Sequence, residues 1–158
     1  MDARKVLPLV ILIYFTAGLA FVISQNPWFS FTRNALSDMG SLKNPKGWIF
    51  NLYIMGLGIL GLITAKALKR DVLKIAMLTL ILVGVFPEEK PLHTPSAVLT
   101  YLLSFLDMVL YGKIWRIIGL GTFILMIALI KMGIGLAIPE VIGAIVIITY
   151  IMCLGWRE

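Results

Sequence analysis

The sequence predicts an all-α fold: an integral membrane bundle of six transmembrane helices, formed as a single domain over residues 1–158. Composition is the first observation behind this prediction. Of the 158 residues, 60% are hydrophobic and only 14% are charged, whereas a soluble domain carries about 25% charged residues. The second observation is that the apolar residues form runs of about 20 residues, the length with which a helix crosses a bilayer. We therefore expect a multi-pass protein of the cell (cytoplasmic) membrane, with membrane lipids as partners.

Six apolar runs are candidates for these helices. In chain order they are Val6–Ser24, Trp48–Ala65, Val72–Phe86, Ser96–Gly112, Ile114–Ile130 and Leu136–Leu154. The first follows a basic start but exceeds the roughly 7–15 apolar residues of a signal peptide, so we expect an uncleaved span. The second opens with aromatic residues, which favour the headgroup level. The third is short, and its Lys74 can extend to the interface.

The last three spans are separated by turn-forming and basic residues. The fourth is preceded by Pro95, which is favoured in the first turn of a helix, and it ends at Gly112 and Lys113. The apolar stretch after Lys113 is too long for one span. Lys131 and Gly133 interrupt it, so we divide it into a fifth and a sixth span.

The distribution of Lys and Arg predicts that both termini lie in the cytoplasm. With that orientation nine basic residues lie inside, namely Arg4, Lys5, Lys66, Lys69, Arg70, Lys74, Lys113, Arg116 and Arg157. Five lie outside, namely Arg33, Lys43, Lys46, Lys90 and Lys131. Cytoplasmic loops carry the excess of basic residues in membrane proteins. The net charge of +6 is scattered over helix ends, which favours lipid contact over nucleic-acid binding.

Two polar segments, residues 25–47 and 87–95, fall on the outer face in this orientation. In the first, Thr32 can cap and Gly40 can end a short amphipathic helix. Asn34, Ser37 and Asp38 share one face of that helix because they are three and four residues apart. Ordinary turn chemistry also favours Asn, Ser and Asp, so spacing alone leaves both interpretations open.

The second polar segment contains three ionisable acceptors, Glu88, Glu89 and His93. Pro87 and Pro95 restrict this segment, so Glu88 and His93 are expected to be held in place. A lone histidine is more often a surface residue than a ligand or base, and that alternative stands beside the functional one.

A polar stripe runs along the fourth span. Its members recur at helical spacing and are Ser96, Thr100, Ser104, Asp107 and Tyr111. An acidic residue within a span faces the bundle interior or a water-filled cavity. The stripe therefore indicates either a proton or ion path, or hydrogen bonds between helices. In the second case we expect Asp107 to meet Lys113 or another basic residue.

Several kinds of site are excluded by residue counts. With one cysteine, Cys153, the chain forms no internal disulfide and no cysteine-based metal cluster. With one histidine it forms no three-histidine zinc site within a subunit. The run Gly56–Gly61 matches G-x-G-x-x-G, but no strand precedes it, so close helix packing is the better explanation.

The two polar segments together resemble a known family. Asn34-Ala35-Leu36-Ser37-Asp38-Met39-Gly40, followed by Phe86-Pro87-Glu88 and His93, resembles a prokaryotic membrane family catalogued as domain of unknown function 998. The resemblance covers essentially the whole chain, including the six spans. It implies that Asn34, Ser37, Asp38, Glu88 and His93 are the family's polar positions, and it implies no activity.

Three hypotheses follow for an outward-facing site, and the sequence leaves open whether the protein is an enzyme. In a hydrolase or transferase acting at the lipid headgroup level, Asp38, Glu88, His93 and Ser37 are the catalytic candidates. Asn34, Arg33 and Lys43 would bind substrate. Asp38, Glu88 and His93 also suit a divalent metal, the one candidate cofactor.

The second hypothesis is a small proton-coupled transporter, which would use the Asp107 stripe and would benefit from forming a homo-oligomer. In the third, the polar residues only lock the two outer segments together. Substrate, metal and oligomeric state are not determined by the sequence.

Overall fold

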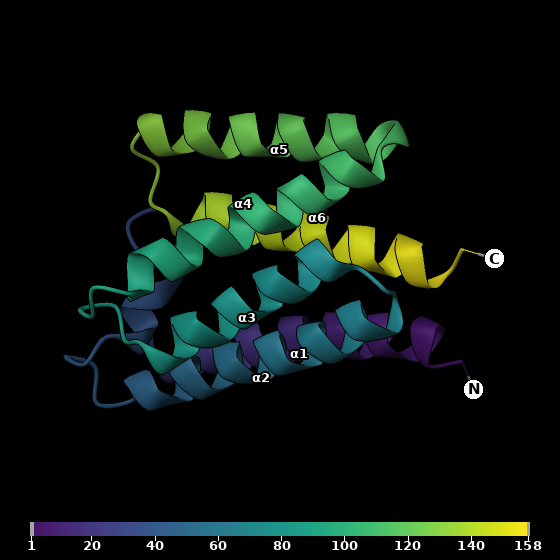
Figure 1. The fold of residues 1–158 in the computed structure, drawn as a ribbon. Coiled ribbons are helices and arrows are strands. Elements are labelled where there is room, and N and C mark those ends of the chain that lie inside the picture. Colours follow the sequence, from purple (N-terminus) through teal and green to yellow (C-terminus); the bar gives the residue numbers. More distant parts are fainter. Residues whose placement is uncertain (1, 158) are drawn as a thin grey trace.

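A computed structural model describes residues 2–157, and within that part of the chain all regular structure is helical (Figure 1). There are six α-helices and one short 3₁₀ helix, η1. Their bounds are α1 Ala3–Gln25, η1 Leu36–Gly40, α2 Gly47–Ala67, α3 Asp71–Val85, α4 His93–Tyr111, α5 Lys113–Lys131 and α6 Ala137–Gly155. The predicted spans agree with the six α-helices to within three residues at every end.

Five of these helices, all except α3, are long and apolar enough to cross a membrane. Helix α3 has 15 residues, which at 1.5 Å per residue gives about 22 Å, less than the ~30 Å of a bilayer's hydrocarbon core. Apolar side chains on the outside of the bundle fit the same environment. Ile117 and Ile124 on α5, for example, are 69% and 65% exposed.

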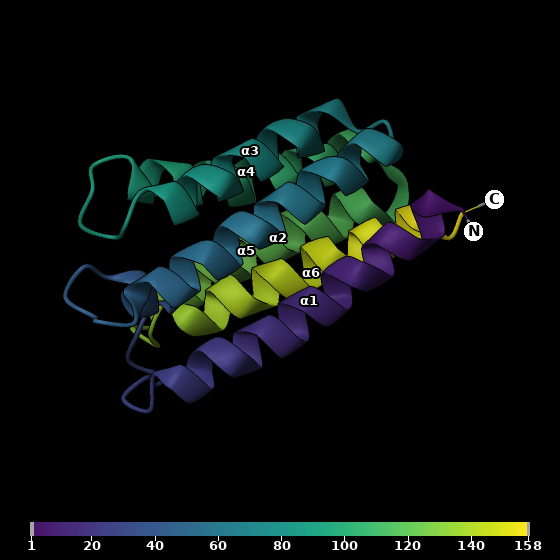
Figure 2. The same cartoon turned by 90° about the horizontal axis from the view of Figure 1, so that it is seen from below.

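The helices form a ring, with one helix outside it (Figures 1 and 2). Helix α1 packs on α2, α2 on α3, α3 on α4, α4 on α6, and α6 returns to α1. Helix α5 packs against both α4 and α6 from the outside. Gly112, with a φ of +80°, permits the reversal between α4 and α5. The interior of the ring is therefore enclosed by five helices.

Helices α2 and α3 approach each other most closely where glycines face the partner helix. A Cβ built on Gly61 would lie 2.3 Å from Met77 Sδ, and one on Gly84 would lie 2.6 Å from the backbone oxygen of Asn51. Small residues allow helix backbones to come this close in membrane proteins. This explains the glycine-rich run in the second span by packing, as the sequence predicts.

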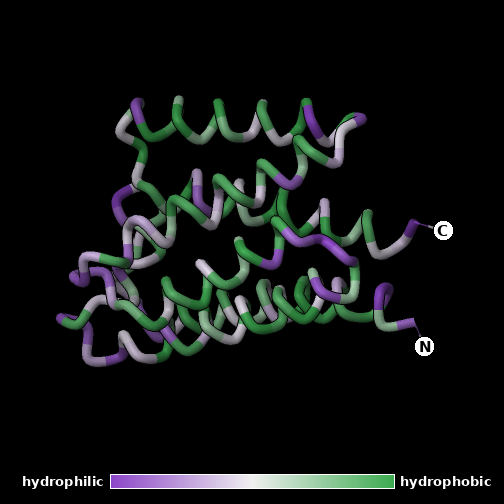
Figure 3. Tube along the Cα trace, in the orientation of Figure 1, coloured by the Kyte–Doolittle hydropathy of each residue, from purple (hydrophilic) through white to green (hydrophobic). Residues whose placement is uncertain are grey.

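Both ends of the chain lie at one end of the bundle, and the three longest connections lie at the other (Figure 1). We call the latter the loop end. It contains residues 26–46, 86–92 and 132–136. Hydrophilic residues gather at the two ends, and the helices between them are mainly hydrophobic (Figure 3). Any polar site at the loop end is thus backed by an apolar interior.

Candidate functional site

The first polar segment folds around Asp38. Asn34 Nδ2 donates to Asp38 Oδ2 at 2.8 Å, and the backbone N–H of Ala35 donates to the same oxygen at 3.1 Å. Ala35 and Met39 are both buried. The contact between residues 34 and 38 follows the expected four-residue spacing. However, the helix is shorter than predicted, since only Leu36–Gly40 is helical and it is a 3₁₀ helix.

The helix is shorter because the residues before it bind the connection between α5 and α6, residues 132–136, and the first residue of α6. The backbone oxygens of Thr32 and Asn34 accept hydrogen bonds from Gly135 N at 3.0 Å and Ala137 N at 2.9 Å. Residues 32–34 therefore pair with another part of the chain instead of with the next turn of their own helix. Gly135 has no room for a side chain, because a Cβ there would lie 2.7 Å from the carbonyl carbon of Thr32.

The second polar segment is tied to the first through Glu89. Its carboxylate accepts hydrogen bonds from the Ser41 hydroxyl and from the backbone N–H of Leu42. These hydrogen bonds lower the pKa of the Glu89 carboxyl to about 2. Glu89 thus joins the two segments as an ionised group, which is a structural contact.

His93 is the first residue of α4 and is only 4% exposed. Helix α4 begins three residues before the predicted span, so the histidine belongs to a helix and not to a loop. Its Nδ1 lies 2.7 Å from the backbone oxygen of Phe86. Because a carbonyl oxygen can only accept, Nδ1 carries the proton, and in the neutral ring Nε2 is then the basic nitrogen.

Glu88 and Asp38 form a pair of carboxyl groups between the two segments. Burial raises the pKa of the Glu88 carboxyl above its ordinary value of 4.5, and Asp38, which shares a hydrogen bond with it, raises that pKa further. The charge of His93 acts in the opposite direction. Glu88 therefore holds a proton more readily than an isolated carboxyl group, as one member of a close carboxyl pair does.

Glu140, near the start of α6, completes this group and was not among the predicted site residues. Its Oε2 accepts a hydrogen bond from the backbone N–H of Leu36 at 2.8 Å, and Asp38 and Glu88 are close enough to interact with it electrostatically. The signal was present in the sequence. Glu140 is an acidic residue in an apolar run, and such a residue, like Asp107, is expected to face the bundle interior or a water-filled cavity.

A cavity of about 110 Å³ lies inside the ring of helices. Its polar lining at the loop end consists of Ser37, His93 and Glu140, while most of the remaining lining is aliphatic. This combination, an apolar pocket with a few convergent polar groups, is typical of small-molecule binding sites. The structure therefore brings Ser37 and His93 to one cavity, with Asp38 and Glu88 linked to its rim through Glu140.

The predicted basic and metal-binding residues have a different placement. Arg33 and Lys43 are exposed on the first segment, and neither lines the cavity. Among residues 2–157, no three His, Cys, Asp or Glu side chains are arranged to hold one metal ion. Glu140 is the acidic residue that lines the cavity.

The polar stripe of α4 faces the bundle interior. Ser96, Thr100, Ser104 and Asp107 are all buried. Thr100 Oγ1 lies 2.9 Å from Thr79 Oγ1 on α3. Ser104 Oγ has no hydrogen-bond partner among the described residues. The stripe thus contributes contacts between helices at several levels.

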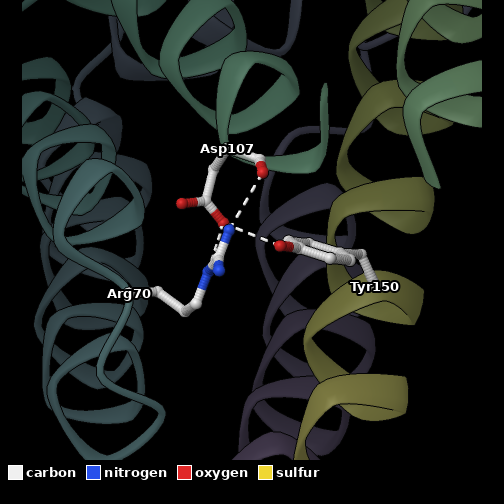
Figure 4. Close-up of polar contacts among 3 residues, drawn as sticks. All are labelled: Arg70, Asp107 and Tyr150. Carbon is white, nitrogen blue, oxygen red and sulfur yellow. Dashed lines mark hydrogen bonds and ion pairs between the residues drawn. The ribbon is translucent and has the colours of Figure 1, made fainter. Parts of the chain in front are cut away.

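Asp107 is the centre of a network near the terminal end of the bundle (Figure 4). Arg70 Nε donates to Asp107 Oδ2 at 3.0 Å, and the Tyr150 hydroxyl donates to the same oxygen at 2.8 Å. The Arg70 guanidinium also lies 5.1 Å from the ring centre of Tyr111, the last member of the stripe. The basic partner of Asp107 is therefore Arg70 and not Lys113.

Fold and contacts together define a class: a multi-pass helical membrane bundle whose interior cavity is capped by polar segments at one end. Within this class, the chain belongs to the family described as "Protein of unknown function (DUF998)", whose model matches residues 9–157. The predicted family is thereby confirmed over nearly the whole chain. No curated protein and no solved structure matches the chain.

Proposed function

We propose that this protein is an enzyme of the cytoplasmic membrane, a hydrolase or transferase that acts on an amphipathic lipid at the headgroup level. The observation that carries the proposal is the cavity, in which Ser37, His93 and Glu140 are placed over an aliphatic interior. In this reading α3 is a short sixth span and both termini are cytoplasmic. The polar end of the cavity, with Ser37, His93 and Glu140, then lies toward the outer face, where headgroups lie.

The proposed reaction uses the ring nitrogen that has no structural role. His93 Nδ1 is engaged by Phe86, which leaves Nε2 as general base. In an ester substrate, the Ser37 hydroxyl attacks the carbonyl carbon while its proton moves to Nε2. The alcohol leaves with that proton, and water or a second alcohol then releases the acyl group from Ser37. In this second step Nε2 takes the proton of the attacking water or alcohol and returns it to the Ser37 oxygen. The overall reaction consumes one ester and one water or alcohol, and it releases the first alcohol and an acid or a new ester.

The carboxyl groups have supporting roles in this scheme. Glu140 is fixed by Leu36 N, so it holds η1, and with it Ser37, beside the cavity. Glu88, whose pKa is raised, can donate a proton, while Asp38 is held as an acceptor by Asn34 and Ala35. A pair of carboxyl groups with different environments is a recurring basis of acid–base catalysis.

Lipid turnover by the purified protein in nanodiscs tests the proposal. We expect products from a mixed phospholipid extract, detected by mass spectrometry, and a loss of roughly 10²–10⁴-fold in Ser37→Ala. Ser41→Ala is the matched control, because Ser41 contacts Glu89 outside the cavity. Equal turnover by Ser37→Ala and Ser41→Ala would contradict the assignment of Ser37.

A structural role is the second candidate, and it has an observation of its own. Asp38, Glu89 and Glu140 each accept a hydrogen bond from a backbone N–H of the first polar segment. Such contacts fix the first polar segment against its neighbours and would serve a purely structural role. The transporter alternative is not favoured in the same way, because the Asp107 carboxylate already has Arg70 and Tyr150 as partners.

A further inference from the structure

The cavity has a polar end and an apolar body, and its depth can be read along α4. Its lining on that helix runs from His93 at the loop end through Ala97 to Ser104. At 1.5 Å per residue this distance is about 16 Å. The hydrocarbon core of a bilayer is ~30 Å thick. The cavity therefore reaches about as deep as one leaflet.

The far end of the cavity is marked by the last residue that each helix contributes to its lining, which on α6 is Ile151. Ser104 is the last residue of α4 that lines it. Asp107, one turn further, is held by Arg70 and by Tyr150 of α6 (Figure 4). This network joins the start of α3, α4 and α6 next to the last lining residues, Ser104 and Ile151. We take this network as the floor of the cavity. The ionisable lining side chains, His93 and Glu140, lie at the loop end, and the hydroxyl groups of Thr100 and Ser104 lie further in.

We propose that the cavity holds one hydrocarbon chain of a lipid from the leaflet that the loop end faces, and that its closed floor limits the length of that chain. This inference rests on the proposed function and names its substrate class. Depth, aliphatic lining and the position of the polar groups all match a chain whose headgroup region lies beside Ser37, His93 and Glu140.

Length selection follows from packing. A chain in a bilayer is already in an apolar environment, so entering the cavity gains little from the hydrophobic effect. What distinguishes chains is how well they fill the pocket. A short chain leaves a void and loses dispersion contacts, and a chain longer than the pocket meets the floor and forces side chains to move. Binding should therefore peak at one chain length.

The test uses ether-linked lipids with a photoactivatable diazirine at the chain end, in nanodiscs, over a series of chain lengths. Such lipids cannot be hydrolysed at the linkage, so binding is measured independently of turnover. We expect cross-links on cavity-lining residues of α4 and α6, mapped by mass spectrometry. We also expect a maximum of labelling at one length, falling roughly tenfold for one methylene too many.

Ala144→Phe places a larger side chain in the cavity, and Ile145→Phe is its control on the lipid-facing side, where Ile145 is 51% exposed. We expect Ala144→Phe to shift the maximum to shorter chains or to abolish cavity cross-links, and Ile145→Phe to change neither. If Ala144→Phe does not fold, Ala97→Phe on α4 serves the same purpose, since Ala97 also lines the cavity.

The outcomes separate the two proposals. Cross-links confined to outward-facing residues such as Ile145 and Ile117 in the wild-type protein would overturn the chain site. Labelling that is independent of chain length would overturn the limit set by the floor. Cavity cross-links without any turnover of ester lipids would support the chain site while contradicting the enzyme. Turnover of ester lipids without cavity cross-links would support the enzyme while contradicting the chain site.

Discussion

At the scale of single residues, the acidic side chains of the loop end have two possible uses. Asp38, Glu89 and Glu140 bind backbone N–H groups of the first polar segment, and unpaired buried N–H groups are costly. Glu88 instead lies beside another carboxyl group, which disfavours its ionised form. Glu88 is therefore the acidic residue of the loop end whose placement is explained least well by structure alone.

Replacing Asp38 by alanine should lower stability. The change removes hydrogen bonds to Asn34 Nδ2 and Ala35 N, for which we expect a cost of about 1–3 kcal/mol. Thermal unfolding in detergent measures it, with Asp71→Ala as control because Asp71 is exposed and pairs only with Lys74. An unchanged unfolding temperature for Asp38→Ala together with lost activity would contradict a purely structural role.

The pH dependence of stability should differ in sign between Glu88 and Glu89. Because the Glu88 pKa is raised above 4.5 in the folded protein, its stabilising effect is present below pH 4.5 and is lost as pH rises through the folded value. Glu89, with its pKa lowered to about 2, stabilises above pH 4.5 and loses that effect as pH falls toward 2.

Unfolding temperatures of Glu88→Gln and Glu89→Gln across this pH range check both signs. Relative to the wild-type protein, Glu88→Gln should gain stability as pH rises above 4.5. Glu89→Gln should lose stability relative to the wild-type protein as pH rises from about 2 to 4.5. Parallel curves for the two variants would be inconsistent with the assigned environments.

At this scale the sequence predicts local contacts better than distant ones. The pairing of Asn34 with Asp38 is local in sequence and agrees with the expected contact, although Asn34 lies just before the 3₁₀ helix and not within it. The meeting of Glu88 with Asp38 was suggested by the family resemblance, since no spacing rule connects residues fifty positions apart. Glu140 lies outside both polar segments, so their pattern does not predict its place in the site, although an acidic residue in an apolar run is itself a signal. The burial of His93 depends on where α4 begins.

At the scale of elements, close packing of α2 and α3 gives a paired prediction. A Cβ on Gly84 would meet the Asn51 oxygen at 2.6 Å and Met55 N at 2.9 Å, and backbone atoms cannot move aside cheaply. Gly84→Ala should therefore destabilise the protein by about 1–3 kcal/mol. In contrast, Gly121 on α5 has no atom within 4 Å of an added Cβ.

Gly121→Ala is thus the matched control, and it should be neutral or stabilise by up to about 1 kcal/mol through helix propensity. Thermal unfolding of both variants in the same detergent decides the point. If Gly84→Ala unfolds at the same temperature as Gly121→Ala, α2 and α3 are not packed as described.

Helix positions were largely predictable because a long apolar run has few alternatives to a helix in a membrane. The 3₁₀ helix Leu36–Gly40 was not predictable in its true length. Its start is determined by hydrogen bonds from Gly135 and Ala137, about a hundred residues away. The cavity was equally inaccessible to sequence reasoning, since it depends on how five helices surround one space.

At the scale of the whole molecule, the proposed orientation places the loop end outside the cell. In a background where Cys153 is replaced by Ser, Lys43→Cys should react with a membrane-impermeant maleimide on intact cells, and Lys66→Cys should react only after permeabilisation. Both lysines are exposed. Lys43 lies at the loop end, and Lys66 lies at the opposite end of the bundle, where the chain begins and ends. The reverse pattern would place both termini outside, contrary to the positive-inside rule.

The central claim is that the loop-end cavity is a catalytic site, and the most direct measurement is lipid turnover by His93→Gln. His93 is the one histidine in the sequence, so no other imidazole can replace it. The account predicts multiple product molecules per wild-type protein and a rate lower by roughly 10²–10⁴-fold in His93→Gln, with the ether-lipid cross-links in the cavity retained. Equal turnover by the two proteins, or no turnover by a folded wild-type protein that binds the lipid, would contradict it.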